Sequence, residues 1–283
     1  MPNPSIIITG ASVGIGAATA TALAKRGHPL ILSARRSEEL EAVAADVRKA
    51  GGQATTVIGD ICDPVTRAAI VREGLANGGI YGLVNNAGFG QAGPVELVGE
   101  AAAKRQFEVN IFALMELTRL ALPHMRAHKT GRIVNVSSVL GRVSRPMYGW
   151  YCASKFALEA LSDALREEVY PFGIRVSIVQ PGPIETEFGQ AAGVAMDNLE
   201  AAAKPAYAAH LAGMARRGER RHKGVAPARV ASAIVHALFV RRPRVVYRVT
   251  ATTRVVQTLA WLLPRGWVGA IAARETGLPR KML

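Results

Sequence analysis

The sequence contains few cysteines. Its 283 residues include only Cys62 and Cys152, which stand far apart and form no Cys-x-x-Cys pair. This spacing excludes a disulfide framework, so we expect two small, buried apolar side chains in a reducing compartment. Hydrophobic residues make up 49% of the chain and charged residues 20%, a composition that excludes a disordered or fibrous protein.

Long hydrophobic runs are also missing. No uninterrupted apolar stretch reaches the roughly 18 residues that a membrane-spanning helix needs. The first apolar run begins at Ser5, which leaves no room before it for a secretion signal. We therefore expect a cytoplasmic protein, with peripheral contact at a membrane surface left open.

Acidic residues are scarce in the C-terminal quarter. Residues 215–283 hold 15 of the 35 lysines and arginines but only two acids, Glu219 and Glu275, so this quarter carries +13 of the net charge of +14. A nucleic-acid-binding protein would spread its positive charge through the fold, and we expect no nucleic-acid partner. The asymmetry instead indicates an appended contact with an anionic surface, or a device for solubility.

Short strand-like runs alternate with amphipathic helical stretches along most of the chain. The expected strands are Ser5 to Thr9, Pro29 to Ala34, Ala54 to Ile58, Ile80 to Val84, Gly131 to Ser137, Ile174 to Gln180 and Val245 to Val249. The expected helices cover residues 15–26, 37–50, 64–77, 100–128, 152–170 and 227–240. Nearly continuous apolar strands separated by helices predict an α/β protein with a doubly wound parallel sheet, a Rossmann fold, in one domain over residues 1–250.

Two segments interrupt this alternation. Residues 183–226 run long without a strand, and an excursion of that length is typical of a lid, so we interpret it as a substrate-binding flap. Residues 251–283 form a basic amphipathic extension in which an apolar stripe falls on one helical face: Val255, Val256, Leu259, Leu262 and Leu263. The stripe suits an anionic membrane surface, the core of the domain or a neighbouring subunit.

A glycine-rich loop follows the first strand. The chain reads Thr9-Gly10-Ala11-Ser12-Val13-Gly14-Ile15-Gly16 and then enters a helix. Glycines at such a junction allow positive φ and let a pyrophosphate approach backbone amides at a helix N-terminus. The spacing is not Gly-x-Gly-x-x-Gly, so the loop alone is a weak signal.

The end of the second strand strengthens that signal. It reads Ala34-Arg35-Arg36, where a dinucleotide fold that binds NAD places a carboxylate for the ribose 2′-hydroxyl. Two arginines in place of a carboxylate would bind a 2′-phosphate. We therefore predict NADP(H) in preference to NAD(H), although both arginines would also suit a solvated strand end.

Candidate site residues, most of them polar, collect at the C-terminal ends of the later strands, where α/β folds bind their ligands. They are Asn85, Asn86, Ala87 and Gly88 after the fourth strand, Asn110 in the next helix, Ser137 and Ser138 after the fifth strand, and Tyr151 and Lys155. Tyr151 and Lys155 are four apart and share a helix face. A tyrosine loses its proton near pH 10, so an adjacent cation would favour the phenolate that acid–base work requires.

As a set, these motifs resemble those of the short-chain dehydrogenase/reductase family, in its classical single-domain type, from about Ile6 to Thr186. The resemblance implies that Tyr151 is the general acid/base, that Lys155 lowers its pKa, that Ser138 binds the reacting oxygen and that Asn110 holds a water in a proton relay. It also implies a cofactor site, which comprises Gly10, Ser12, Gly14, Ile15, Gly16, Arg35, Arg36, Asp60, Ile61, Asn86, Ala87, Gly88, Tyr151, Lys155, Pro181, Gly182, Ile184 and Thr186. By the same resemblance Asp60 contacts the adenine and the Pro181 segment holds the nicotinamide carboxamide.

The expected function is hydride transfer between NADP(H) and a carbonyl or secondary alcohol. A lipophilic substrate is favoured by the apolar residues expected near the site: Phe89, Leu140, Val143, Tyr148, Phe188, Met196, Leu199, Tyr207 and Met214. A sugar or acyl thioester is the alternative substrate, and a non-catalytic NADP-binding regulatory protein is the alternative class. The resemblance also implies that the helices near residues 100–128 and 152–170 pair in a homodimer or homotetramer. An apolar face that this interface or the domain's own core could use is supplied by Phe156, Ala157, Ala160, Leu161 and Ala164. His124 and His128 have the spacing of a metal pair but no third ligand, so no metal site is expected.

Overall fold

A seven-stranded parallel sheet forms the centre of the protein. The computed structural model describes residues 3–186, 204–212 and 224–275. The strand order is β3-β2-β1-β4-β5-β6-β7, with all pairs parallel. The strands are β1 Ser5–Thr9, β2 Leu30–Ala34, β3 Ala54–Ile58, β4 Ile80–Asn85, β5 Gly131–Val136, β6 Ile174–Gln180 and β7 Val246–Arg248. The predicted doubly wound α/β fold is confirmed, and the predicted strand ends differ from these by one residue at most.

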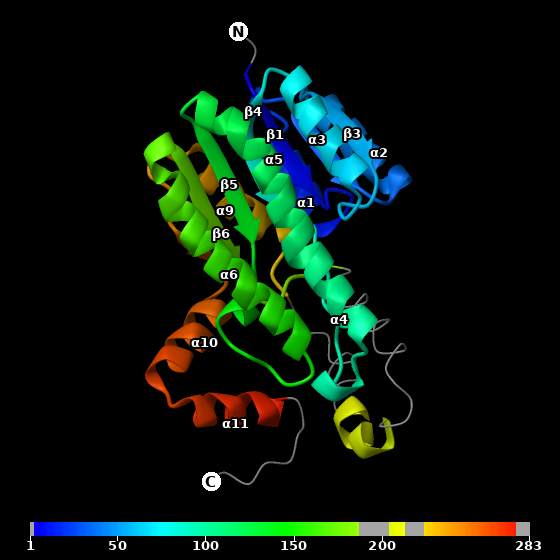
Figure 1. Ribbon diagram of the computed structural model, residues 1–283, viewed down its shortest axis with the longest axis vertical. Helices are drawn as coiled ribbons and strands as arrows, with labels where there is room; N and C mark the ends of the chain where they lie inside the picture. Colours follow the sequence, from blue (N-terminus) through cyan, green and yellow to red (C-terminus); the bar gives the residue numbers. More distant parts are fainter. Residues whose placement is uncertain (1–2, 187–203, 213–223, 276–283) are drawn as a thin grey trace.

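Helices cover both faces of the sheet, as Figure 1 shows. One face carries α1 Gly14–Leu23, α2 Ser37–Lys49 and α9 Pro227–Phe239, and the other carries α3 Pro64–Ala76, α5 Leu114–Ala127 and α6 Gly149–Val169. The central strand explains why both faces are filled. Ile6 and Ile8 point into the first layer and Ile7 into the second, and all three are fully buried. Successive side chains of a strand alternate between faces, so a continuous apolar run requires cover on both.

The long helical segment before β5 contains a change of helix type. The sequence predicts one helix over residues 100–128, and the structure has α4 Glu100–Phe107, a π-helical turn η2 at Glu108–Ala113, and then α5. Single π turns within α-helices occur often at functional sites. Asn110 lies in this turn. The remaining short turns are η1 Val95–Leu97, η3 Val139–Gly141, η4 Tyr170–Phe172 and η5 Lys204–Tyr207.

The two ends of the predicted flap lie side by side. The Val225 amide donates to the Pro183 carbonyl at 3.0 Å, and the Glu185 amide donates to the Val225 carbonyl at 3.2 Å. The excursion between them therefore leaves and rejoins the domain at one place, next to the end of β6. Of the apolar residues that we expected in the flap, Phe188, Met196, Leu199 and Met214 fall outside the described residues.

The C-terminal extension forms two helices, α10 Ala251–Leu262 and α11 Arg265–Glu275, beyond the C-terminal ends of the strands (Figure 1). Thr250 caps α10, since its hydroxyl accepts from the Thr253 amide at 3.1 Å. One interpretation expected the apolar stripe to pack on the core of the domain. Three of its five residues, Val255, Leu259 and Leu262, are exposed. Thr253 and Gln257 face the protein instead. No helix in the described ranges is long and apolar enough to cross a membrane.

Candidate active site

The glycine-rich loop has the geometry of an anion cradle. Gly10 and Gly14 have φ of +63° and +58°, which a residue with a side chain adopts only with strain. A Cβ on Gly16 would lie 2.2 Å from the Gly10 carbonyl oxygen, so the first turn of α1 packs directly on the loop. Helix α1 has no side-chain cap and no acid in its first turn, which leaves its amides available to an anion.

The segment after β4 is fastened to this loop. The Asn86 side-chain amide donates to the Thr9 and Gly10 carbonyls, at 3.0 Å each. The Thr9 hydroxyl accepts from the Asn86 and Ala87 amides. Asn86 therefore ties the segment after β4 to the end of β1 and to the glycine loop. Of the other predicted loop residues, Ser12 is buried and Ile15 packs against the core.

Two arginines lie exposed beyond the end of β2. Arg35 and Arg36 both reach solvent, and Arg36 pairs with Glu39 of α2 at 3.4 Å. Ala34 ends the strand, so no carboxylate occupies its last position. This edge of the site is therefore positively charged and accessible to a ligand phosphate.

Asp60 has a partner that the sequence analysis missed. Its carboxylate accepts from the Cys62 amide at 2.9 Å and pairs with Arg105 of α4 at 2.5 Å. Partial burial acts to raise the pKa of Asp60, but these bonds outweigh it and hold the pKa below its ordinary value. Ile61, the next predicted residue, packs in the core layer of α3 and α5. An adenine contact at Asp60 would therefore involve a carboxylate that is already ionised and positioned.

Tyr151, Lys155 and Ser138 meet at the C-terminal edge of the sheet. Helix α6 places Tyr151 and Lys155 one turn apart, with the Lys155 Nζ 5.9 Å from the centre of the Tyr151 ring. Tyr151 is 6% exposed and Lys155 5%. Ser138 follows β5 in an extended conformation, and its hydroxyl lies beside the Tyr151 phenol, where it acts to lower the pKa of Tyr151. A phenol, a hydroxyl and a lysine cation thus share one partly enclosed site.

Burial dominates the acid–base properties of this group. It raises the pKa of Tyr151 well above the ordinary value, whereas the Ser138 hydrogen bond acts in the opposite direction. Burial also lowers the pKa of Lys155 to about 8, and the charge of Glu159 opposes that shift. That Lys155 lowers the pKa of Tyr151 stays a prediction from the family resemblance.

Asn110 is held rigidly beside the lysine. Its Oδ1 accepts from the Phe89 amide at 3.1 Å, and its Nδ2 donates to the Phe89 carbonyl at 3.1 Å and to the Ser154 Oγ at 3.0 Å. Lys155 Nζ donates to the Val136 carbonyl at 2.8 Å. A Cβ on Gly88 would lie 3.1 Å from Asn110 Oδ1 and 3.7 Å from Lys155 Nζ, so Asn110 and Lys155 meet across this glycine. The arrangement suits the predicted proton relay, in which a water molecule would connect Asn110 with Lys155.

Glu159 is a second residue that the sequence analysis missed. It lies one turn beyond Lys155 and is almost fully buried. Its carboxylate accepts from Ser137 Oγ at 2.7 Å, from Arg142 Nε at 2.7 Å and from Gln180 Nε2 at 2.7 and 2.9 Å. Ser137 directly follows β5, Arg142 directly follows η3, and Gln180 is the last residue of β6. One carboxylate therefore joins the ends of β5, η3 and β6.

The segment after β6 lies across from the glycine loop. The Val139 amide donates to the Pro181 carbonyl at 2.8 Å, and a Cβ on Gly14 would lie 3.0 Å from the Thr186 methyl carbon. Gly182 has no room for a side chain, because a Cβ there would lie 2.4 Å from the Thr250 Oγ1. Ile184 packs against the core layer of α1 and α9.

The apolar residues predicted to line the substrate site differ in burial. Phe89, Leu140 and Tyr148 are partly exposed and Val143 is buried. Tyr207 packs with Leu97 and Trp150, and its hydroxyl donates to Glu96 at 2.7 Å. Among the described residues, no group of three side chains is placed to hold a metal ion, and the His124 and His128 rings stack on each other at 4.1 Å.

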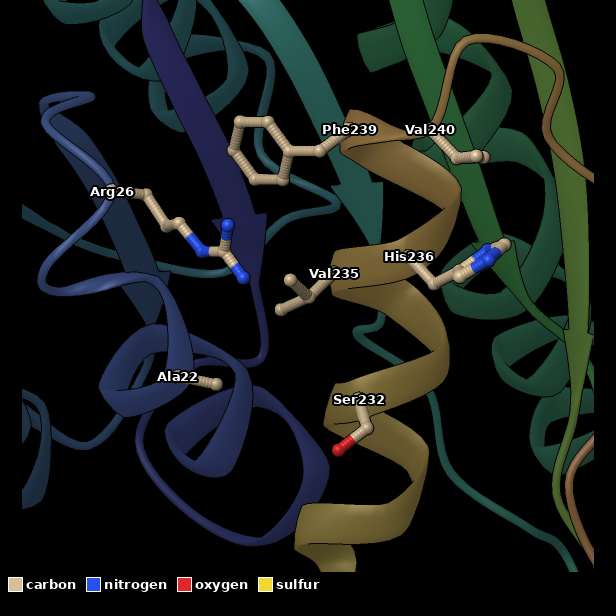
Figure 2. Close-up of a pocket in the computed structure, with 7 residues that line it drawn as sticks. All are labelled: Ala22, Arg26, Ser232, Val235, His236, Phe239 and Val240. Atoms are coloured by element: carbon tan, nitrogen blue, oxygen red, sulfur yellow. The ribbon is translucent and has the colours of Figure 1, made fainter.

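A separate groove lies on the outer surface between α1 and α9 (Figure 2). It has a volume of about 490 Å³, and Arg26 lies over the Phe239 ring at 5.4 Å. Its lining residues are Ala22, Arg26, Ser232, Val235, His236, Phe239 and Val240, none of which belongs to the predicted site. The groove is therefore distinct from the catalytic group.

The residues present fit a nicotinamide dinucleotide. Glycines that tolerate no Cβ line the approach to α1, two exposed arginines follow β2, and Ser138 and the buried Lys155 lie beside Tyr151. An extended ligand with two phosphates and a ring at the tyrosine uses all three features.

Comparison with known proteins agrees with this geometry. The chain is 37% identical to the uncharacterized oxidoreductase YbbO of Escherichia coli, over 92% of this chain and 90% of that protein. It is 36% identical to a 3-ketodihydrosphingosine reductase of Bacteroides thetaiotaomicron, over 65% of each.

Solved structures give the same result. A short-chain dehydrogenase from Streptomyces avermitilis has a TM-score of 0.79 and 33% identity, over 97% of this chain and 96% of that chain. A metagenomic short-chain oxidoreductase in complex with NADP has a TM-score of 0.68 and 29% identity, over 87% of this chain and 97% of that chain. The family model for short chain dehydrogenases matches residues 4–196, and the chain therefore belongs to the short-chain dehydrogenase family of oxidoreductases.

Proposed function

We propose that this oxidoreductase transfers hydride between NADP(H) and a carbonyl or secondary alcohol of a lipophilic substrate. The observation that carries the proposal is the placement of buried Tyr151 and Lys155 one helical turn apart on α6, with Ser138 beside Tyr151 after the end of β5. A non-catalytic, regulatory NADP-binding protein would not need this buried group.

The chain's own residues then perform proton transfer and orientation. A nicotinamide dinucleotide supplies or accepts the hydride when bound. Ser138 donates to the substrate oxygen and holds it beside Tyr151. In carbonyl reduction, the Tyr151 phenol gives its proton to that oxygen as the oxygen becomes a hydroxyl. Lys155 stabilises the phenolate that remains, and Asn110, fixed by Phe89 and Ser154, borders the route by which a proton returns.

Preference for NADP(H) rests on Arg35 and Arg36. Both are exposed at the end of β2, where no carboxylate is present to bind a ribose hydroxyl. The structural relative in complex with NADP supports this assignment. A 2′-phosphate would form charge-assisted bonds with these guanidinium groups.

A lipophilic substrate is supported by the apolar flank formed by Phe89, Leu140, Val143 and Tyr148. The name of the related 3-ketodihydrosphingosine reductase points to the same substrate class. A sugar or acyl thioester is the alternative, and it would require polar partners on this flank.

Assembly and location complete the proposal. Phe112, Phe156 and Leu161 are exposed on the adjoining η2 and α6 and would be covered in a homodimer or homotetramer. We place the enzyme in the cytoplasm, with residues 1–250 as the catalytic domain, 183–226 as its flap and 251–283 as an extension suited to membrane contact.

The test is NADPH oxidation against a panel of aromatic, steroid, aliphatic, sugar and acyl-thioester carbonyls. The Tyr151→Phe variant removes only the hydroxyl, and Tyr170→Phe makes the same change at an exposed tyrosine. We expect the wild type and Tyr170→Phe to turn over substrate. In Tyr151→Phe we expect the turnover rate to fall by about 100-fold or more. Tight NADPH binding without turnover on any substrate class would favour the regulatory alternative.

A further inference from the structure

Helix α10 presents its apolar side outward. Its side chains that face the protein are polar, Thr253 and Gln257. Val255 is 57% exposed and Leu262 62%, and Trp261 is 83% exposed. A helix of a globular protein normally buries its apolar face and exposes its polar one. The reversed orientation of α10 indicates a face that something else covers.

Helix α11, which contacts α10, also exposes apolar side chains. Trp267 is 59% exposed, and Ile271, one turn later, is also exposed, whereas Ala270 and Ala273 pack inward. We call the exposed apolar residues of the two helices the hairpin face: Val255, Leu259, Trp261, Leu262, Trp267 and Ile271. Two tryptophans among aliphatic side chains are typical of the boundary between lipid headgroups and acyl chains.

The charge around the hairpin face distinguishes between two candidate partners, a second copy of this chain and an anionic lipid surface. Residues 224–274 contain eight arginines and no aspartate or glutamate. Exposed Arg254 lies two turns before Trp261, and exposed Arg248 and Arg274 lie near the two ends of the hairpin. A second copy of this chain would bring an equally basic surface, which disfavours self-association there. An anionic lipid surface offers the complementary charge.

The hairpin also borders the catalytic end of the domain. Thr250, at the start of α10, lies against Gly182, and α10 contacts η3 directly after Ser138. Figure 1 shows α10 and α11 beyond the C-terminal ends of the strands, below α6. A surface that holds the hairpin face therefore lies close to the site.

We propose that the hairpin face docks on an anionic bilayer and holds the catalytic end of the sheet next to the membrane. Trp261, Leu262 and Trp267 enter the headgroup boundary while the arginines contact lipid phosphates. A substrate dissolved in the bilayer would then reach Tyr151 without crossing bulk water. This last step rests on the proposed function, whereas the docking itself does not.

Co-sedimentation of the full-length protein with vesicles tests the docking. The vesicles contain phosphatidylcholine alone or phosphatidylcholine mixed with phosphatidylglycerol, each at low and high salt. We expect binding to the mixed vesicles that weakens with salt, and quenching of tryptophan fluorescence by brominated lipids. No binding to mixed vesicles at low salt overturns the proposal.

A matched pair of double variants localises the contact. Trp261→Ser with Leu262→Ser removes one aromatic and one aliphatic side chain from the hairpin face, and Tyr170→Ser with Leu75→Ser does the same at exposed sites elsewhere. We expect the first pair to reduce vesicle affinity at least about ten-fold and the second to leave it unchanged. Equal binding by both variants overturns the assignment to this face.

Two further readouts distinguish a lost membrane contact from misfolding and from self-association. Circular dichroism melting shows whether each variant folds. If the Trp261→Ser with Leu262→Ser variant does not fold, Trp267→Ser on α11 provides an independent substitution on the hairpin face. Light scattering measures self-association, and a change of oligomeric state in the first double variant without vesicle binding would assign the face to a second copy and refute the proposal. Vesicle binding needs no turnover, so its outcome is independent of the enzyme assay.

Discussion

Glu159 lies one helical turn beyond Lys155 on α6, and both side chains are almost completely buried. The negative charge of Glu159 raises the pKa of Lys155, against the burial that lowers it to about 8. The same carboxylate binds Ser137 and Gln180, which directly precede Ser138 and Pro181. Glu159 is therefore placed to set the charge of the catalytic lysine and to position two neighbouring segments.

Replacement of Glu159 by glutamine keeps the shape of the side chain and removes its charge. The Lys155 pKa should then fall further, because burial is no longer opposed. We expect the alkaline limb of the kcat/KM profile, where the ammonium is lost, to move to lower pH by roughly one unit. Asp163→Asn is the control, since Asp163 also pairs with Arg142 but lies a further turn away. Superimposable wild-type and Glu159→Gln profiles would contradict this role.

The buried lysine should also leave a signature in stability. Its pKa falls from 10.5 to about 8 in the folded chain, so between these values the unfolded chain binds more protons. This group therefore makes the free energy of unfolding rise with pH in that window. We expect the difference between wild type and Lys155→Met to grow in favour of the wild type, by up to about 3 kcal/mol from pH 8 to pH 10. Urea unfolding across this range measures it, and a constant difference would argue against the shift.

Gly16 has no space for a methyl group. Its Cβ would lie 2.2 Å from a backbone oxygen of Gly10, and backbone cannot move aside as a flexible side chain can. We expect Gly16→Ala to abolish dinucleotide binding and to destabilise the fold by about 1–3 kcal/mol. At Gly266 in α11 no atom lies within 4 Å of the added Cβ, so Gly266→Ala should be neutral or slightly stabilising. Calorimetry with NADPH and thermal melting of both variants make the comparison; retained binding by Gly16→Ala would exclude this loop as the phosphate site.

Cofactor preference should depend on the arginines after β2. We expect Arg35→Ala to raise the KM for NADPH about ten-fold or more and to leave the KM for NADH nearly unchanged, because a charge-assisted bond to phosphate is lost. Arg26→Ala removes an exposed arginine in the groove of Figure 2 and serves as the control. A wild type that prefers NADH, or an Arg35→Ala variant with equal losses for both cofactors, would refute the assignment.

Much of this architecture could be predicted from local sequence patterns. The apolar runs predict the strand ends to within one residue, because a strand covered on both faces must be apolar throughout, as Ile6, Ile7 and Ile8 show. Glycine spacing predicts the loop before α1 because positive φ favours glycine. Both predictions depend on residues close together in the chain.

Other features depend on contacts that no local pattern encodes. Glu159 looks like a solvated helical acid until Ser137, Arg142 and Gln180 surround it, and Arg105 pairs with Asp60 from a different element. The π turn at Asn110 changes which side chains face the site. The stripe on α10 has the correct period for burial, but its orientation is set by Thr253 and Gln257 packing against the domain.

The most direct measurement follows deuterium from NADPH labelled at the transferred position of its nicotinamide ring, with any carbonyl that supports turnover. Mass spectrometry of the product reports transfer, and calorimetry reports NADPH binding by wild type and Tyr151→Phe. With the wild type we expect deuterium on the former carbonyl carbon. With Tyr151→Phe we expect unchanged NADPH binding and almost no deuterium transfer. Deuterium transfer at the wild-type rate by Tyr151→Phe would contradict the central role of Tyr151.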